Sequence, residues 1–205
     1  MINTLYYING CPGARAVRLF CKHNNLQVEE VLIDFKKGEH MTKEFLSLNP
    51  MHTVPTVKFD DGSGMYESRL ILKYLNGEEN NNLEIDKWLF WDLGFLNTNV
   101  GKVIYPRLFM NSEPTEKDIN RLVEKLVYLN KYLENNDFLV NNNFSIADLS
   151  SAMLVYNSQI RDDIIEVNLN NYPNIKKWLN NIKEQFSIDE WEDVMGPFFS
   201  WKNSL

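Results

Sequence analysis

A cysteine followed by proline stands at the head of a run of helix formers, in the stretch NGCPGARAV. A free thiol has a pKa of about 8.5, and a helix N-terminus lowers it, because the helix dipole stabilises a thiolate. A thiolate at Cys11 could attack a disulfide or a mixed adduct. Alternatively, Cys11 is a small turn residue and Tyr6 or Tyr7, in the preceding apolar run, supplies an acidic hydroxyl. Cys21 is expected to pack in the core.

The segment NPMHTVPTV contains a second group of candidates. A helix should stop at Asn49, because Pro50 disfavours helical geometry in the residue before it, and a strand should open at Pro55. If the bond between Val54 and Pro55 is cis, the Val54 N–H and C=O turn outward and can pair with an extended peptide. The alternative is an ordinary trans proline in a loop.

The stretch YESRLILKYL places three polar residues where a helix should start. The Ser68 hydroxyl and the free N–H groups of the first turn would form an anion site that the helix dipole supports. Glu67 could bind an ammonium group, and Arg69 could bind a carboxylate. A plain capping serine between two solvated charges explains the same residues.

The elements that must position these groups form an α/β unit in the first part of the chain. Its expected order is a strand at 4–8, a helix at 14–25, a strand at 28–33, a short helix at 42–49, two strands at 55–59 and 65–67 around a DDGSG turn, and a helix at 68–76. We assign residues 1–76 to this first domain and the polar run at 77–84 to a linker.

Beyond the linker, strand signals are scarce and residues 85–205 are predicted to be all helical. The expected helices lie at 85–109, 118–135, 145–160 and 172–186. The segment at 118–135 has an apolar stripe with the i, i+3, i+4, i+7 spacing. Ser145 and Asp148 are spaced as a capping box.

Composition indicates a soluble globular protein that works in a reducing compartment, most simply the cytoplasm. The chain has 205 residues, of which 44% are hydrophobic and 24% charged, and it lacks a run of about 20 apolar residues or a secretory signal. Cys11 and Cys21 on one helix would lie roughly 15 Å apart, too far for a disulfide. The net charge of −7 argues against binding to nucleic acid or anionic membranes.

These segments together resemble a known family. The stretch KKGEHMTKEFLSLNPMHTVPTVKFDDGSGMYESRLILKYL is very similar to delta- and epsilon-class glutathione transferases, and more broadly to the theta-like branch. VIYPRLF, SIAD and IDEWEDVMG have counterparts there as well, so the resemblance spans both halves. It implies an α+β fold, in which a thioredoxin-like N-terminal domain precedes an all-α C-terminal domain. It also implies a homodimer that uses glutathione as co-substrate and needs no metal or other cofactor.

The resemblance also implies roles for individual residues. For glutathione, His40 and His52 would reach the glycyl end, Val54 would pair with the cysteinyl backbone ahead of cis-Pro55, and Glu67, Ser68 and Arg69 would hold the γ-glutamyl end. For a hydrophobic small-molecule electrophile, the wall would consist of Tyr105, Phe109 and Phe199.

The chain departs from this pattern at its chemical centre. Delta-like members have a serine after the first strand whose hydroxyl bonds to the glutathione thiolate, and the resemblance places Cys11 there; no serine occurs between Met1 and Asn25. CPGARAVRL also resembles the cysteine-type branch, such as the omega class. We therefore expect a glutathione transferase that conjugates hydrophobic electrophiles. The alternatives are a cysteine-type thiol transferase or dehydroascorbate reductase, and a non-catalytic glutathione-fold scaffold.

Overall fold

The chain forms two compact units in a computed structural model that describes residues 1–77 and 82–205. One unit contains Met1–Asn81 and Ser187–Leu205, and the other contains Asn82–Phe186. Part of the predicted linker, residues 78–81, lies outside the described residues. The sequence predicts that the end of the chain belongs to the helical domain. The structure instead groups this segment with the first unit, because its helix packs on the first helix of the chain.

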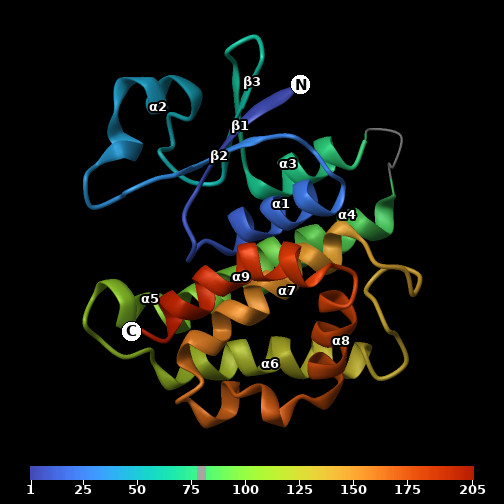
Figure 1. Cartoon of the computed structure of the whole chain (residues 1–205). Coiled ribbons are helices and arrows are strands. Elements are labelled where there is room, and N and C mark those ends of the chain that lie inside the picture. Colours follow the sequence, from blue (N-terminus) through green and yellow to red (C-terminus); the bar gives the residue numbers. More distant parts are fainter. Residues whose placement is uncertain (78–81) are drawn as a thin grey trace. The chain divides into compact units, whose positions relative to one another are not determined.

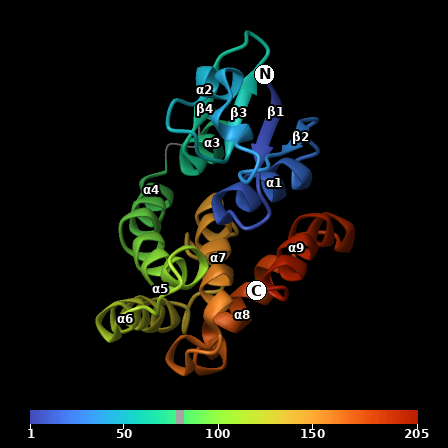
Figure 2. The same ribbon diagram turned by 90° about the vertical axis from the view of Figure 1, so that its left-hand side faces the viewer.

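The first unit is built on a four-stranded mixed sheet. Its strands, in the order β2-β1-β3-β4 seen in Figure 2, are β2 (Glu29–Leu32), β1 (Ile2–Tyr7), β3 (Thr56–Phe59) and β4 (Gly64–Tyr66). β1 and β2 are parallel, while β3 is antiparallel to both β1 and β4. A parallel pair needs a crossover connection, which a helix between β1 and β2 provides. The predicted strands and the predicted hairpin are confirmed.

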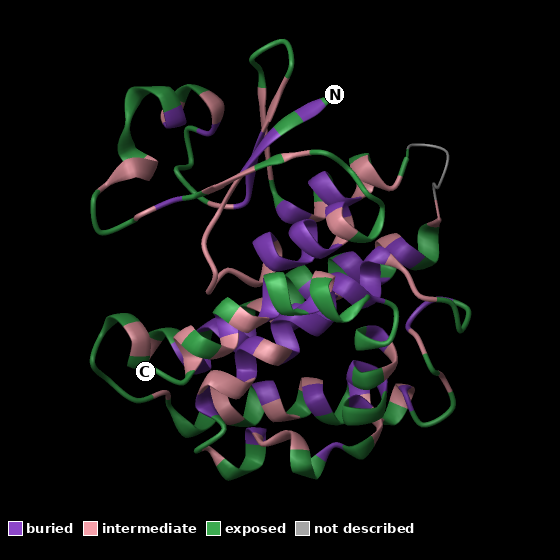
Figure 3. Cartoon of the chain, viewed as in Figure 1, coloured by how far each residue is buried: buried purple, intermediate pink, exposed green. Residues whose placement is uncertain are grey.

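The described residues of the first unit also form four α-helices. They are α1 (Pro12–His23), α2 (Lys43–Leu48), α3 (Ser68–Leu75) and α9 (Ile188–Lys202). α1 and α3 lie side by side, and α2 contacts β3 and β4 on the other side of the sheet (Figure 1). Much of α1 is buried, as the purple ribbon in Figure 3 shows. This burial fixes the start of α1, where Cys11 and Pro12 enter the helix.

α9 runs along α1 and is bound to it by contacts at successive turns. Asp193 accepts ion pairs from Lys22 at 2.7 Å and from Arg18 at 3.3 Å. The Arg15 guanidinium lies 3.6 Å from the centre of the Phe198 ring. The sequence pattern predicts no individual helix for this segment. The structure nevertheless has one, with a Ser187 and Glu190 capping box, because these contacts select it.

The second unit is all helical, as predicted. Its helices are α4 (Leu83–Trp91), α5 (Thr98–Phe109), α6 (Glu116–Tyr132), α7 (Ile146–Ser158) and α8 (Pro173–Lys183). A π-helical stretch, Asp92–Asn97, joins α4 to α5, so the long helix predicted over 85–109 is continuous but irregular. α7 is buried along almost its whole length and packs against α4, α5 and α8 (Figure 3). None of the described helices is long and apolar enough to cross a membrane.

The predicted capping box at the start of α7 is confirmed and has further partners. The Asp148 carboxylate accepts hydrogen bonds from the Ser145 backbone N–H at 3.0 Å and from the Ser145 hydroxyl at 2.8 Å. It also accepts from the Leu139 N–H at 2.7 Å and from the Trp178 indole at 2.9 Å. One buried carboxylate therefore ties the start of α7 to α8 and to the loop before it.

Candidate active site

The starts of α1 and α3 and the loop before β3 meet at Gly13. A Cβ atom on Gly13 would lie 2.5 Å from the Ser68 Oγ and 3.5 Å from the Pro55 Cδ. Only a residue without a side chain allows such a close approach. The structure therefore brings together three segments that the sequence analysis singled out separately.

The Cys11 thiol lies at this meeting point, directly before the first turn of α1. The residue is half-buried, and its thiol accepts no capping bond from the helix. Instead, the Cys11 Sγ donates a hydrogen bond to the Val54 carbonyl oxygen at 3.2 Å. The thiol and the backbone predicted to pair with a peptide are thus direct neighbours.

Burial raises the pKa of the Cys11 thiol above its ordinary value. The backbone N–H groups of Ala14 and Gly13 and the guanidinium groups of Arg15 and Arg69 act in the opposite direction without compensating for it. The helix N-terminus therefore lowers this pKa, as the sequence predicts, but burial outweighs it and the net shift is upward. A thiolate at this buried position would lose more solvation free energy than the helix N-terminus provides in electrostatic stabilisation. In addition, the neutral form is stabilised because its S–H donates a hydrogen bond to the Val54 carbonyl.

The loop between α2 and β3 is held by the amide of one buried residue. The Asn49 side chain donates to the Thr53 carbonyl at 3.0 Å and to the Thr56 hydroxyl at 2.8 Å, and it accepts from the Met51 N–H at 2.9 Å. The bond between Val54 and Pro55, inside this loop, is cis, which confirms the sequence expectation. The sequence predicts only that a helix ends at Asn49, and it gives no local signal for the supporting role of this residue.

The start of α3 differs in one detail from the predicted capping serine. Glu67 is the residue before the helix, and its φ of 73° is on the left-handed side, which costs a non-glycine residue about 1–3 kcal/mol. Ser68 is the first helical residue and is buried, while Arg69 is half-buried. Among the described residues, neither the Glu67 carboxylate nor the Ser68 hydroxyl has a hydrogen-bond partner, so both remain open to a ligand.

The two histidines of the predicted site lie next to each other. Their ring centroids are 6.0 Å apart, and the His40 ring stacks on Phe35 at 4.2 Å. The His40 Nδ1 is buried and has no hydrogen-bond partner among the residues that the structure describes. His52, with a φ of 47°, is exposed two residues before Val54. The pair is placed to receive an anionic group.

Comparison with known proteins identifies the family. Residues 10–78 match the model of the glutathione S-transferase N-terminal domain. Residues 101–193 match the model of the glutathione S-transferase C-terminal domain. The chain belongs to the glutathione S-transferase family.

Solved structures of this family resemble the transferase over almost its whole length. A delta-class glutathione transferase of Nilaparvata lugens is 28% identical, with a TM-score of 0.83 over 98% of both chains. A Bombyx mori glutathione transferase in complex with GTT is 26% identical, with a TM-score of 0.84 over 98% of this chain and 96% of that one. An epsilon-class glutathione S-transferase from the housefly, Musca domestica, is 26% identical, with a TM-score of 0.83 over 98% of this chain and 95% of that one. The thioredoxin-like and all-helical domains of the prediction are confirmed.

The strand tyrosines of the transferase are engaged in packing. The Tyr6 ring meets Phe45 edge to face at 5.5 Å. Burial raises the pKa of the Tyr6 hydroxyl, and the Glu29 carboxylate adds to the increase. The Arg18 guanidinium lies 4.1 Å from the centre of the Tyr7 ring. The environment of Tyr6 disfavours its ionised form, and the Tyr7 ring packs against Arg18. The alternative to Cys11 therefore has little support.

The predicted wall for the electrophile is only partly assembled within one unit of the transferase. Tyr105 and Phe109 lie one turn apart on α5, with ring centroids 5.6 Å apart, and both are exposed. Phe199 belongs to α9 in the other unit. Trp201, on the same helix, covers the turn before Cys11, because a Cβ atom on Gly10 would lie 3.1 Å from its indole ring.

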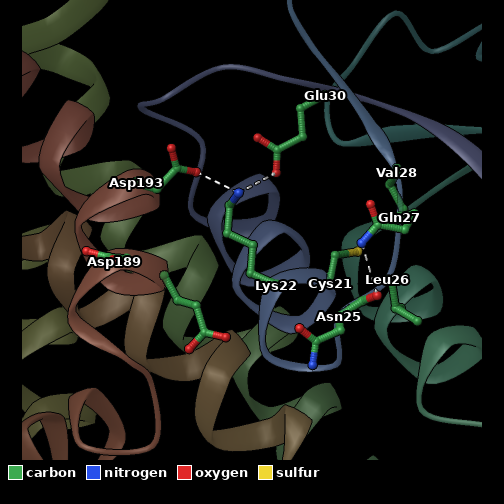
Figure 4. Close-up of a pocket in the computed structure, with 10 residues that line it drawn as sticks. Cys21, Lys22, Asn25, Leu26, Gln27, Val28, Glu30, Asp189 and Asp193 are labelled. Atoms are coloured by element: carbon green, nitrogen blue, oxygen red, sulfur yellow. Dashed lines mark hydrogen bonds and ion pairs between the residues drawn. The ribbon is translucent and has the colours of Figure 1, made fainter.

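A hollow in the first unit of the transferase lies at the C-terminal end of α1 (Figure 4). Its volume is about 580 Å³, and it is lined by Cys21, Lys22, Asn25, Leu26, Gln27, Val28, Glu30, Asp189, Glu190 and Asp193. Figure 4 shows Lys22 pointing between Asp193 and Glu30, at 2.7 and 3.8 Å. Burial raises the pKa of Cys21 to about 11. None of the predicted site residues lines this hollow, and the charges at its centre pair with each other.

Proposed function

We propose that this transferase binds the main chain of glutathione along Val54, holds its sulfur beside Cys11, and joins that sulfur to a hydrophobic electrophile. The observation that carries the proposal is the 3.2 Å contact between the Cys11 Sγ and the Val54 carbonyl oxygen. The Val54 N–H has no hydrogen-bond partner among the described residues. A cysteinyl residue that pairs with this backbone brings its own sulfur next to Cys11.

The charged ends of glutathione find complementary groups around this point. The tripeptide has two carboxylates and one ammonium group. The Glu67 carboxylate suits the ammonium group, while Ser68, Arg69 and the N-terminus of α3 suit the γ-glutamyl carboxylate. His40 and His52 suit the glycyl carboxylate. Arg69 and the N-terminus of α3 supply local positive charge in a chain whose net charge is −7.

The proposed reaction is a nucleophilic displacement at carbon, with the glutathione sulfur as the nucleophile. The glutathione thiol gives its proton to water, and the thiolate attacks an electrophilic carbon, so that a C–S bond forms while the leaving group departs with its bonding electron pair. Cys11 stays a neutral thiol. When glutathione is bound, the Cys11 S–H turns from the Val54 carbonyl oxygen to the thiolate and donates a weak bond to it. A neutral Cys11 avoids the repulsion between two thiolates and is a poor nucleophile for disulfides. The step uses no metal or further cofactor.

The electrophile is a hydrophobic small molecule that contacts Tyr105 and Phe109 in the second unit. The aromatic pair on α5 supports this assignment, because Tyr105 is 45% and Phe109 is 74% exposed and neither ring is consumed by core packing. Aromatic surfaces of this kind are typical of adaptable sites for apolar ligands.

We further propose that the protein is a cytoplasmic homodimer. Two free cysteines suit a reducing compartment. In the second unit, α4, α6 and the π-helical stretch expose several large apolar side chains, which suits burial against a second copy. These residues are Phe90, Leu93, Phe95, Val127 and Tyr128. Light scattering of the eluted protein should give twice the 24.1 kDa of one chain, and a mass of one chain would refute the dimer.

The test of the proposed reaction compares the protein with Cys11→Ser and Cys11→Ala on two substrates. With 1-chloro-2,4-dinitrobenzene, we expect conjugation by the unmodified protein, equal or higher rates for Cys11→Ser, and a loss of about tenfold or more for Cys11→Ala, because a hydrogen bond to a charged group contributes about 1.5–3 kcal/mol. With a glutathionyl mixed disulfide, all three should be slow.

Two other outcomes would overturn the proposal. Fast reduction of the mixed disulfide that Cys11→Ser abolishes would make this a cysteine-type thiol transferase. Binding of glutathione in a calorimeter, without turnover of either substrate by any variant, would make it a scaffold.

A further inference from the structure

A hollow in the second unit lies beside the aromatic pair of α5. Its volume is about 450 Å³, within the range of about 300–1,000 Å³ that small-molecule pockets occupy. It is lined by Asn97, Thr98, Gly101, Lys102, Tyr105, Pro106, Met110 and Asp118. Tyr105, Pro106 and Met110 give it an apolar side, and Met110 is 70% exposed.

The Tyr105 ring lies directly against Gly101, one helical turn earlier. A Cβ atom on Gly101 would lie 2.9 Å from Cε2, 3.3 Å from Cδ2 and 3.6 Å from Cζ of this ring. Residues four apart on a helix share a face, so any side chain at position 101 would occupy the space that the ring now fills. The direction of the Tyr105 side chain thus depends on the absence of a side chain at Gly101.

Glycine is otherwise a poor choice for this position. Gly101 is inside α5 and buried, and alanine would stabilise a helix interior better. The backbone of Gly101 needs no glycine, since its φ is not positive. The contact with Tyr105 gives a physical reason for the residue, whereas a Cβ atom on Gly94, in the π-helical stretch, would meet nothing within 4 Å.

We infer that Gly101 is a positioning residue for the electrophile site, which lets the Tyr105 ring lie against α5 and so leaves the neighbouring hollow open to an aromatic substrate. This inference rests on the proposed function, in which Tyr105 contacts the electrophile. With a side chain at position 101, the ring turns away from the helix and into the space beside it. Because a ring at the end of a flexible side chain moves easily, the change alters the pocket and leaves the fold intact.

The test uses Gly101→Ala, with Gly94→Ala as the matched control. Gly101→Ala should raise the KM for 1-chloro-2,4-dinitrobenzene three- to tenfold, while kcat and the KM for glutathione change less than twofold. Gly94→Ala should change none of these constants. The melting temperature of both variants should equal or exceed that of the unmodified protein, because alanine favours helix. An equal rise in KM for both glycine variants would overturn the inference.

A double-mutant cycle identifies Tyr105 as the route of the effect. Tyr105→Ala alone should also raise the KM for the electrophile. In its background, Gly101→Ala should have no further effect beyond 1.5-fold, because the ring that it displaces is gone. Effects that multiply in the double variant would show that Gly101 acts without Tyr105 and would overturn the inference.

A binding measurement separates this inference from the proposed function. 1,3-Dinitrobenzene has no leaving group, and its dissociation constant can be measured by quenching of tryptophan fluorescence. Gly101→Ala should raise this constant by the same factor as the KM. If the unmodified protein shows no turnover but the binding effect is present, the proposed function fails and the inference stands. If turnover is normal and Gly101→Ala changes neither constant, the inference alone fails.

Discussion

At the scale of single residues, the chemical role of Cys11 depends on the hydrogen bond that its S–H donates. A thiol that donates to the Val54 carbonyl, in a position where burial raises its pKa, is a hydrogen-bond donor and not a ready nucleophile. The same residue in water at a helix start would tend toward a thiolate. The environment of the sulfur, which sequence does not reveal, therefore decides between conjugation and disulfide exchange.

Asn49 is the residue whose loss should most disturb the loop that carries Val54. Replacing Asn49 with alanine removes the amide bonds to Thr53, Thr56 and Met51 and leaves buried polar groups unpaired. We expect the free energy of unfolding in urea to fall by about 2–4 kcal/mol. Glutathione binding should weaken as well, because the Val54 backbone loses its fixed position.

Asn24 provides a control for that prediction. Its amide donates to the Phe20 carbonyl at 2.9 Å on the surface, and water can replace this bond. Asn24→Ala should therefore lower the free energy of unfolding by less than about 1 kcal/mol. If the two variants are equally stable, the buried amide does not organise the loop.

The structural roles of some residues near the site could be predicted because these residues have a local sequence signal. Pro55 marks a strand start, and Ser68 a helix start, and both lie where the sequence predicts. Asn49 could not be found in this way, since its partners are defined only when the loop is folded. The same holds for Gly13, whose role depends on Ser68, a residue far along the chain.

At the scale of elements, the site exists because α1 and α3 start at the same place. Gly13→Ala tests this directly, since its Cβ would lie 2.5 Å from the Ser68 Oγ and 2.7 Å from the Ser68 Cβ. We expect a loss of about 1–3 kcal/mol in the free energy of unfolding, as is typical of overpacking. Glutathione binding, measured by calorimetry, should weaken at least tenfold because the two helix starts separate.

A second substitution checks the cause of that loss. Ser68→Gly removes both atoms that the new methyl group would meet. In a Ser68→Gly background, Gly13→Ala should therefore cost less than about 0.5 kcal/mol. An undiminished cost would mean that Gly13 is needed for another reason, and the close approach of α1 and α3 would not explain the residue.

Elements with a strong periodic signal could be predicted, while α9 could not. α6 has a regular apolar stripe, and α7 begins at a capping box, so both were recognisable. The segment that forms α9 contains Gly196 and Pro197, which weaken any local helix signal. Contacts of Asp193 and Phe198 with α1 select the helix, and such contacts are absent from a one-dimensional pattern.

At the scale of the whole molecule, the buried thiol of Cys21 makes stability depend on pH. Its pKa is raised to about 11 by burial, with the Glu30 carboxylate adding to the effect. A raised pKa means that the folded state keeps its proton longer than the unfolded chain. The resulting stability is fully present below the unfolded pKa of about 8.5 and is lost as pH rises toward 11.

Cys21→Ala should reduce this pH dependence. Between pH 8 and pH 11, the unmodified protein should lose about 2–3 kcal/mol more free energy of unfolding than the variant, since one pKa unit corresponds to about 1.4 kcal/mol. Urea unfolding at both pH values measures the difference, and comparison within the pair cancels the titration of tyrosines and lysines. Equal losses would show that the Cys21 thiol ionises in the folded state as easily as in the unfolded chain.

The distance between the glutathione sulfur and the Cys11 Sγ in a crystal grown with reduced glutathione tests the central claim most directly. A neutral thiol that donates to a bound thiolate should give about 3.3–4.0 Å between the two sulfurs, with the cysteinyl backbone of glutathione paired to Val54. A sulfur–sulfur bond of about 2.05 Å would instead show a disulfide-forming cysteine. That bond, or an empty site beside Val54, would contradict the account.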